Sequence, residues 1–350
     1  MDFTLSETRA MLADSLRGTL TRGADWAALA ELGVPAALFT EAEGGYGGEG
    51  FDIALVFEEL GRAGAVTPLL DTCILAGGLL AECGADVQVA AILSGESQGA
   101  FAHWEPGSRY SPEPMQTAAR ETDGGWRLTG HKAVVVNAPA SDLILCSARL
   151  PDERTGLFLV ASASSGVELR ETPLMGGGDA AEIILDDTPA QLLTSDAASM
   201  IEARLARACL AQCAEALGLM QAIRDLTLDY LRTRNQFGQP IGRFQALQHR
   251  MADMLIEIEQ VRSAVINLAG HLAADRQTRE HHVSAAKVLT GEVARLVSEE
   301  SIQMHGGIGL TEEYALGRHA IRLSLCDHRF GDVDYHLARF SALSHQENQS

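Results

Sequence analysis

Hydrophobic residues recur with a helical period at the beginning of the chain. Leu12, Leu16 and Leu20 are spaced four residues apart, so they would lie on one face of a helix. Thr4 and Glu7 stand ahead of them in the spacing of a capping box. This pattern predicts a helix that starts close to the N-terminus.

A second helix is predicted further along the same region. The stretch FDIALVFEELGRAG (51–64) is apolar on one side and ends near Gly61 or Gly64, which would close a helix. The glycine-rich EAEGGYGGEG (41–50) before it predicts a loop. We therefore expect an N-terminal helical domain over residues 1–98.

The period changes near residue 99. Asp123, Gly124 and Gly125 form a hairpin signal between two runs of β-forming residues. Pro189 and the two aspartates before it are expected to end this part of the chain. The pattern predicts a central β-barrel-like domain over residues 99–192. The runs that support it are GAFAHWE, TAARET, WRLTGHKAVVV, DLILCSA and GLFLVA.

From about residue 196 the helical period returns. Apolar residues recur at spacings of three and four over 244–268, with charged and polar residues between them. Long amphipathic helices of this kind pack as an antiparallel bundle, so we expect a C-terminal four-helix bundle over residues 193–350. The fold class is thus α+β and multi-domain. The apolar positions are Phe244, Leu247, Met251, Met254, Leu255, Ile258, Val261, Val265 and Leu268.

Composition narrows the function classes. The formal net charge of −20 over 350 residues argues against nucleic acid and against anionic membrane surfaces, because both need a basic patch. No run of eighteen apolar residues predicts a transmembrane helix, and MDFTLSETRA does not have the apolar core of a signal peptide. The six cysteines form no CxxC pair, so free thiols in the cytoplasm are expected, with Cys209 and Cys213 on one helix face.

Four segments of the sequence, in order along nearly the whole chain, resemble acyl-CoA dehydrogenases. RTRNQFGQPIGRFQALQHRMADM (232–254) and QMHGGIGLTEEY (303–314) resemble the strongest motifs of that family, and ELGRAG (59–64) and GHKAVVVNAPASD (130–142) resemble weaker ones. The resemblance implies a flavoprotein with FAD that dehydrogenates an acyl-CoA thioester. In that chemistry a carboxylate removes the α proton while the β hydrogen leaves as hydride to the flavin.

The resemblance also implies which residues contact FAD. Arg234, with Gln236 and Phe237 beside it, would reach across a dimer interface to the pyrophosphate of the neighbouring subunit's FAD, since a guanidinium donates in a planar fork. Gln303 and the backbone at Gly306 and Gly307 would meet the same ADP half. The structural alternative is a helix C-cap at the glycines and a surface ion pair for the arginine.

The usual catalytic base is missing from both positions that the resemblance indicates. Most family members carry a Glu directly before a Gly-Thr; here that residue is Phe330, before Gly331, and Asp332 replaces the Thr. A minority carry the Glu on the helix before the arginine segment, where this chain has Ala208, followed by Cys209. Neither phenylalanine nor alanine can accept a proton.

Other carboxylates could substitute for the lost base. Asp332, and after it Asp334, lie two and four residues beyond Phe330. Glu215 shares a helix face with Ala208, but about 10 Å further along the axis. Glu202 lies on the same stretch without aligning. None of these positions matches the family pattern. His305, His328 and His336 are expected to be structural or exposed, because the family uses no histidine base.

The β domain departs from the family as well. Val134 takes the place of an aromatic residue that commonly packs against the flavin ring. The segment that contacts flavin and substrate is reduced to HWEPGSRYSP (103–112), in which Glu105, Pro106 and Gly107 remain. The losses thus fall on groups that serve a subunit's own active site, whereas the groups directed at a neighbour's FAD are kept.

Such an asymmetry favours a hetero-oligomer. The chain resembles the subunit without catalytic Glu in bacterial α2β2 acyl-CoA dehydrogenases of the steroid side-chain type, which would act with a paralogous, Glu-bearing subunit. An acyl-CoA would be the substrate and an electron-transfer flavoprotein the acceptor, and a single active site would leave room for a bulky acyl group. The alternatives are a self-sufficient homotetramer with an unaligned base and an inactive scaffold that binds flavin or acyl-CoA.

Overall fold

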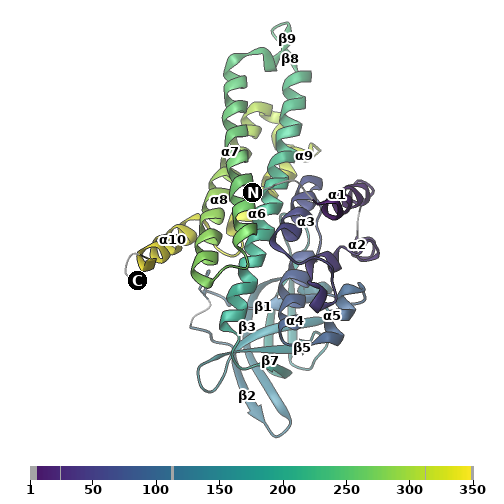
Figure 1. The fold of residues 1–350 in the computed structure, drawn as a ribbon, viewed down its shortest axis with the longest axis vertical. Helices are drawn as coiled ribbons and strands as arrows, with labels where there is room; N and C mark the ends of the chain where they lie inside the picture. Colours follow the sequence, from purple (N-terminus) through teal and green to yellow (C-terminus); the bar gives the residue numbers. More distant parts are fainter. Residues whose placement is uncertain (1–5, 24, 112–113, 312, 348–350) are drawn as a thin grey trace. The chain divides into compact units, whose positions relative to one another are not determined.

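The computed structural model describes residues 6–23, 25–111, 114–311 and 313–347 (Figure 1). Helices precede and follow a region of strands, and the contacts divide the chain into two compact units. One unit holds residues 6–23, 50–65 and 209–347, and the other residues 25–49 and 66–208. The first helical region therefore contributes to both. Its helices are α1 (Glu7–Leu20), α2 (Trp26–Glu31), α3 (Gly50–Ala63), the π-helix η3 (Leu70–Gly77), α4 (Gly78–Glu82) and α5 (Asp86–Leu93).

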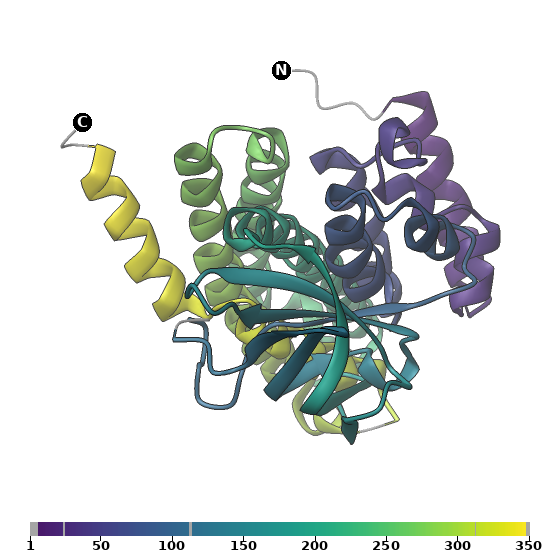
Figure 2. The same cartoon turned by 90° about the horizontal axis from the view of Figure 1, so that it is seen from below.

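The strand region forms a barrel. Pairings close the circuit β4–β2–β3–β7–β5–β4, while β1 pairs with β4 and β6 with β7. Most pairs are antiparallel, and Figure 2 shows the strands as a curved sheet. The bounds are β1 (Gly99–Ala102), β2 (Ala118–Thr122), β3 (Gly125–Val136), β4 (Leu143–Arg149), β5 (Thr155–Ala161), β6 (Val167–Pro173) and β7 (Asp179–Thr194).

The barrel confirms the predicted hairpin and corrects one predicted end. Thr122 pairs with Gly125, so Asp123 and Gly124 form the two-residue turn between β2 and β3. The expectation that Pro189 ends the strands is wrong, because β7 continues to Thr194 and pairs there with β5. The missing N–H of Pro189 is tolerated beside an irregularity of the β3–β7 ladder.

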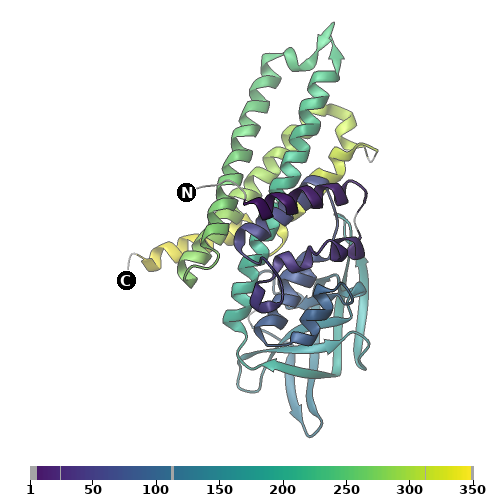
Figure 3. The same cartoon turned by 45° about the vertical axis from the view of Figure 1, so that its right-hand side comes forward.

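The helical unit is built on long helices. Helices α6 (Ala198–Thr233) and α7 (Gln245–His271) run side by side, joined at one end by the short strands β8 (Asn235–Gln236) and β9 (Gln239–Pro240) (Figure 3). α8 (Arg276–His305) packs on α7, and α9 (Ala315–His328) and α10 (Val333–Glu347) pack on α8. Six of the nine apolar residues predicted for 244–268 are buried in α7: Met251, Met254, Ile258, Val261, Val265 and Leu268.

Two glycines let α3 approach α6 closely. A Cβ at Gly61 would lie 2.0 Å from the Glu215 carbonyl oxygen, and one at Gly218 would lie 2.0 Å from the Glu58 carbonyl oxygen. Gly61 is thus inside the helix, which ends before Gly64 at a left-handed φ of +62°.

The first helix begins differently from the prediction. Ser6 caps α1 by accepting from the Arg9 amide at 3.3 Å, whereas Thr4 lies outside the described residues. All six cysteines are free, and five of them are buried. Among the helices in the described part of the chain, none combines the length and the apolar character needed to cross a bilayer.

Candidate functional site

The end of α6 places Arg234 on the surface. Its amide donates to the Tyr230 carbonyl at 2.9 Å, so its backbone continues the last helical turn, and its side chain is exposed. Gln236 pairs with Gln239 in the β8–β9 hairpin. Phe237, at the hairpin turn, has a φ of +54° and is 90% exposed.

The end of α8 carries the other predicted cofactor residues. Gln303 is exposed, and the helix ends at Gly306 with a φ of +67°, a conformation that favours glycine. Gly307 has no positive φ, and a Cβ there would meet no atom of the described chain within 4 Å. Packing within the chain therefore gives no reason for a glycine at 307, whereas close approach of an external ligand would.

The structure brings these two helix ends together. His305, the last residue of α8, stacks on Tyr230 of α6 with 4.5 Å between ring centroids. Figures 1 and 3 both show the end of α8 beside the upper part of α6. Arg234 and the glycine turn thus belong to one surface, although 71 residues separate Arg234 from His305 along the chain.

The first empty base position lies in a loop that the chain holds firmly. Phe330 is half-buried with a φ of +62°, an uncommon conformation for a bulky residue. Buried Lys287 of α8 donates to two carbonyls in the last turn of α9, those of Cys326 (3.0 Å) and Asp327 (3.3 Å), and to the Arg329 carbonyl (2.9 Å) in the loop after it. The buried side chain of Lys287 therefore fixes the backbone that precedes Phe330.

A histidine fixes the same loop from the other side. The Nε2 of His336 donates to the Phe330 carbonyl at 3.1 Å. Burial and the neighbouring Lys287 charge lower the pKa of His336 to about 3, so the ring is neutral at pH 7. His336 thus supports the loop, which keeps a defined shape without carrying a proton acceptor at residue 330.

The carboxylates near Phe330 have other tasks. Asp332 accepts from the Tyr335 amide at 2.9 Å and so caps α10. Asp334 is exposed in the first turn of α10. Sequence reasoning passed over Asp327: its Oδ1 is buried without a hydrogen-bond partner in the described chain, and burial raises its pKa. That atom points at Gly291 of α8, where a Cβ would lie only 2.2 Å away.

The second empty base position lies inside α6. Ala208 is fully buried, and burial raises the pKa of the neighbouring Cys209 thiol to about 12, so neither residue offers a base at neutral pH. Glu215 forms an ion pair with Arg322 of α9, which also donates to the Ala65 carbonyl at 2.9 Å. Glu215 therefore serves packing between helices; Glu202 is half-buried in the same helix.

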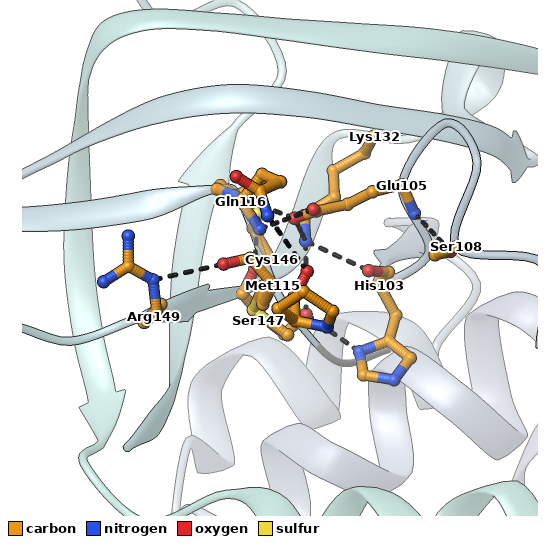
Figure 4. A network of polar contacts seen from close by, with 11 residues as sticks. His103, Glu105, Ser108, Met115, Gln116, Lys132, Cys146, Ser147 and Arg149 are labelled. Atoms are coloured by element: carbon orange, nitrogen blue, oxygen red, sulfur yellow. Dashed lines mark hydrogen bonds and ion pairs between the residues drawn. The ribbon is translucent and has the colours of Figure 1, made fainter. Parts of the chain in front are cut away.

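The β domain contains a buried ion pair that the sequence reading did not single out. Lys132 of β3 is 0% exposed, and its Nζ donates to Glu105 Oε1 at 2.9 Å and to the His103 carbonyl at 3.0 Å (Figure 4). Glu105 also accepts from the amides of Gln116 (2.7 Å) and Thr117 (2.9 Å). The pair ties the beginning of the HWEPGSRYSP segment, and the backbone at residues 116–117 after it, to the barrel wall.

The pKa values of Glu105 and of the neighbouring His103 are both lowered at this pair. Burial acts to raise the pKa of Glu105, but hydrogen bonds from Thr117, Lys132 and Gln116 outweigh it and lower the pKa to about 2. Burial and the Lys132 charge lower the pKa of His103 to about 3. The signal that could have identified Lys132 is its place at an inward position of a strand, where a charge requires a partner.

Val134, two residues further, stands on an irregular part of β3. It is 64% exposed with a φ of +52°, and the β3–β7 register shifts between Lys132 and Val135. A β-branched residue rarely adopts this conformation, so the surrounding ladder must hold it there. No group of three or more metal-ligating side chains occurs in the described part of the chain.

Comparison with known proteins agrees with this architecture. Three family models match in order: "Acyl-CoA dehydrogenase, N-terminal domain" over residues 5–99, "middle domain" over 100–188 and "C-terminal domain" over 198–327. The probable acyl-CoA dehydrogenase YngJ of Bacillus subtilis is 30% identical over 309 residues, which cover 83% of this chain and 81% of YngJ.

Solved structures give the same result. A structure described as a Tcur3481–Tcur3483 steroid ACAD variant is 29% identical with a TM-score of 0.89, covering 99% of this chain and 100% of that chain. The ChsE4–ChsE5 complex from Mycobacterium tuberculosis has the same fold, with 24% identity, a TM-score of 0.86 and 98% coverage of both chains. The chain therefore belongs to the acyl-CoA dehydrogenase family, whose members are FAD-dependent oxidoreductases that act on CH–CH bonds of acyl-CoA thioesters.

Proposed function

We propose that this chain is the subunit without catalytic base of a hetero-oligomeric acyl-CoA dehydrogenase, and that it completes the FAD site of a paralogous, Glu-bearing partner. The observation that carries the proposal is the contrast between the two empty base positions and the exposed helix ends. Phe330 and Ala208 leave both base positions without a proton acceptor. Arg234, Gln303 and the glycine turn nevertheless present donors and open backbone outward.

The outward surface fits one half of a dinucleotide. An exposed guanidinium at Arg234 can donate two parallel hydrogen bonds to a pyrophosphate. The backbone at Gly306 and Gly307 is open because no atom of the described chain would obstruct even a Cβ there. Gln303 adds a neutral amide on the same helix end. FAD, when bound, supplies the hydride acceptor for the reaction.

The chain's own contribution is therefore binding and orientation. Arg234 neutralises charge on the ADP half, and the glycine turn lets the backbone come within contact distance of it. The exposed ring of Phe237 offers apolar area that an interface would cover. Removal of the α proton falls to the partner, because this chain holds no carboxylate at an aligned position.

A relative supports the hetero-oligomer. The Tcur3481–Tcur3483 steroid ACAD carries two components in its name and is 29% identical to this chain along its full length. We infer the same kind of assembly here, with an acyl-CoA substrate bulky enough to use the space of one absent active site. An electron-transfer flavoprotein as acceptor and a cytoplasmic location complete the proposal.

Anaerobic titration with a panel of acyl-CoAs tests the missing base. The chain purified alone should leave added FAD oxidised with every acyl-CoA, whereas the complex with a Glu-bearing paralogue should bleach the flavin band. Bleaching by the lone chain, abolished by Asp327→Asn, Asp332→Asn or Glu215→Gln, would instead indicate a self-sufficient enzyme. Absence of bleaching from any complex that holds FAD would favour a scaffold.

A further inference from the structure

His305 occupies an unusual place among the residues of the proposed FAD surface. It is 4% exposed and immediately precedes Gly306. Its ring contacts Tyr230 of α6, Tyr314 and the Ser301 carbonyl of its own helix.

The first connection is to the helix that carries Arg234. The imidazole stacks on the Tyr230 ring, with 4.5 Å between centroids and 25° between planes. The carbonyl of Tyr230 accepts from the amide of Arg234 at 2.9 Å. A contact that fixes Tyr230 should therefore also fix the helical turn that carries the Arg234 guanidinium.

The second connection fixes the imidazole itself. Its Nδ1 donates to the Ser301 carbonyl at 2.8 Å, which leaves Nε2 to accept from the Tyr314 hydroxyl at 3.3 Å. Tyr314 also packs against the ring at 5.3 Å between centroids. Burial lowers the pKa of His305, although the backbone carbonyls of Ser301 and Leu226 beside the ring act to raise it.

Building on the proposed function, we propose that His305 is a positioning residue that holds two helix ends in register. One is the α6 end that presents Arg234, and the other is the α8 end that presents Gly306 and Gly307. The ring acts as a spacer between Tyr230 and Tyr314. It sets the separation at which a guanidinium and an open backbone can engage one pyrophosphate at the same time, without touching the cofactor.

The chain offers a matched control on the same helix. His281, near the other end of α8, packs at a tilt against Phe340 with 4.1 Å between centroids, and its Nε2 lies 3.2 Å from the Ser344 hydroxyl. It has the same kind of aromatic and hydroxyl neighbours but lies far from the cofactor surface along α8. His281→Ala therefore removes a comparable set of contacts without affecting either helix end.

Hydrogen exchange on the full chain without cofactor tests the spacer independently of FAD. In His305→Ala, amides of residues 230–237 and 303–309 should exchange on the order of tenfold faster, because two helix ends lose a shared support. In His281→Ala these amides should exchange as in the wild type. Unchanged exchange in His305→Ala would overturn the inference, whatever becomes of the proposed function.

FAD retention in the complex with a Glu-bearing paralogue tests the consequence. His305→Ala should weaken FAD binding about tenfold, as expected when one charge-assisted contact loses its alignment. Tyr314→Phe should weaken it less, and His281→Ala not at all, even where thermal stability falls equally. If Arg234→Ala releases FAD and His305→Ala does not, the inference alone is wrong. If the wild-type complex holds no FAD, the proposed function and the inference fail together.

Discussion

The segment at residues 326–332 and the helix ends at 234–237 and 303–307 differ in where their polar contacts are directed. The segment is held by contacts inside the bundle, whereas the helix ends face outward. In the loop, Lys287 and His336 hold the backbone from inside the bundle, and the side chain that such an elaborate frame presents is a phenyl ring. At the helix ends, polar side chains and glycines are open to the outside. The supporting contacts of the loop thus serve the fold, whereas the exposed donors and open backbone at the helix ends favour use by another molecule.

The β domain follows the design of the loop. Lys132 and Glu105 fix the HWEPGSRYSP segment, and the ladder holds Val134 in a rare conformation, although its side chain offers no aromatic surface. Here too, the supporting contacts are present although the side chain at residue 134 lacks the aromatic ring expected beside the flavin. The comparison therefore separates supporting residues, whose loss should unfold the chain, from outward residues, whose loss should release a ligand.

The largest expected effect is on the loop. Lys287→Met leaves three carbonyls without this donor, of which that of Cys326 is buried and those of Asp327 and Arg329 are partly buried. An unsatisfied buried group costs about 1–3 kcal/mol, so the free energy of unfolding should fall by about 3 kcal/mol. Urea denaturation of the lone chain measures this. Arg295→Met on the same helix is the control, since Arg295 is 80% exposed and its contact with Glu299 is 4.0 Å long. Equal effects of the two substitutions would contradict a supporting role.

At the outward surface, a substitution should weaken FAD retention and leave the stability of the lone chain nearly unchanged. Arg234→Ala removes a charge-assisted contact worth roughly 1.5–3 kcal/mol, so FAD retention in the complex should fall about ten- to a hundredfold with little change in the stability of the lone chain. Lysine at 234 should rescue only partly, because it keeps the charge but not the fork. Native mass must be recorded, so that lost flavin is distinguished from lost assembly. An intact complex with unchanged flavin would contradict the cross-subunit role.

Lowering the pH should show how much the ionised Glu105 side chain stabilises the β domain. The pKa of Glu105 is lowered to about 2 in the folded chain, so its stabilising contribution is present above its unfolded pKa of about 4.5 and is lost as the pH falls toward 2. Glu105→Gln should be less stable than the wild type at pH 7, by on the order of 2 kcal/mol. The two stabilities should converge between pH 4.5 and 2. A constant difference across that range would show that the charge of Glu105 is not what stabilises the segment.

The smallest expected effect is at Asp332. Asp332→Ala removes the cap of α10 and should cost about 1 kcal/mol, whereas Asp332→Asn keeps an acceptor for the Tyr335 amide and should be nearly neutral. Neither should change flavin reduction in the complex. Loss of reduction with Asp332→Asn, measured in the anaerobic titration, would make Asp332 a proton acceptor and remove the distinction between loop and helix ends.

Most of the architecture could be predicted because its signals are local. The period of three and four over 244–268 reflects one buried face, and α7 spans Gln245–His271. The strand β6 was missed because most of its residues are exposed, so no apolar alternation marks it. The end of β7 was misjudged because the ladder accommodates Pro189 at an irregularity that only the paired strands define.

The site was less predictable than the fold, for a physical reason. Motifs indicated Arg234 and the glycine turn, but not the residues that support them. Lys287, His305 and Lys132 act through partners 39, 75 and 27 residues away along the chain. The sequence does not distinguish a buried lysine or histidine from an exposed one. The role of such a residue becomes clear only when the structure places its partners around it.

The flavin content of this chain, purified alone and with a Glu-bearing paralogue, tests the central claim most directly. Visible absorbance and native mass should be recorded on both preparations under the same conditions. The account predicts little or no flavin on the lone chain and FAD in a complex that contains both subunits. A lone chain that forms a homotetramer with a full complement of FAD would contradict it.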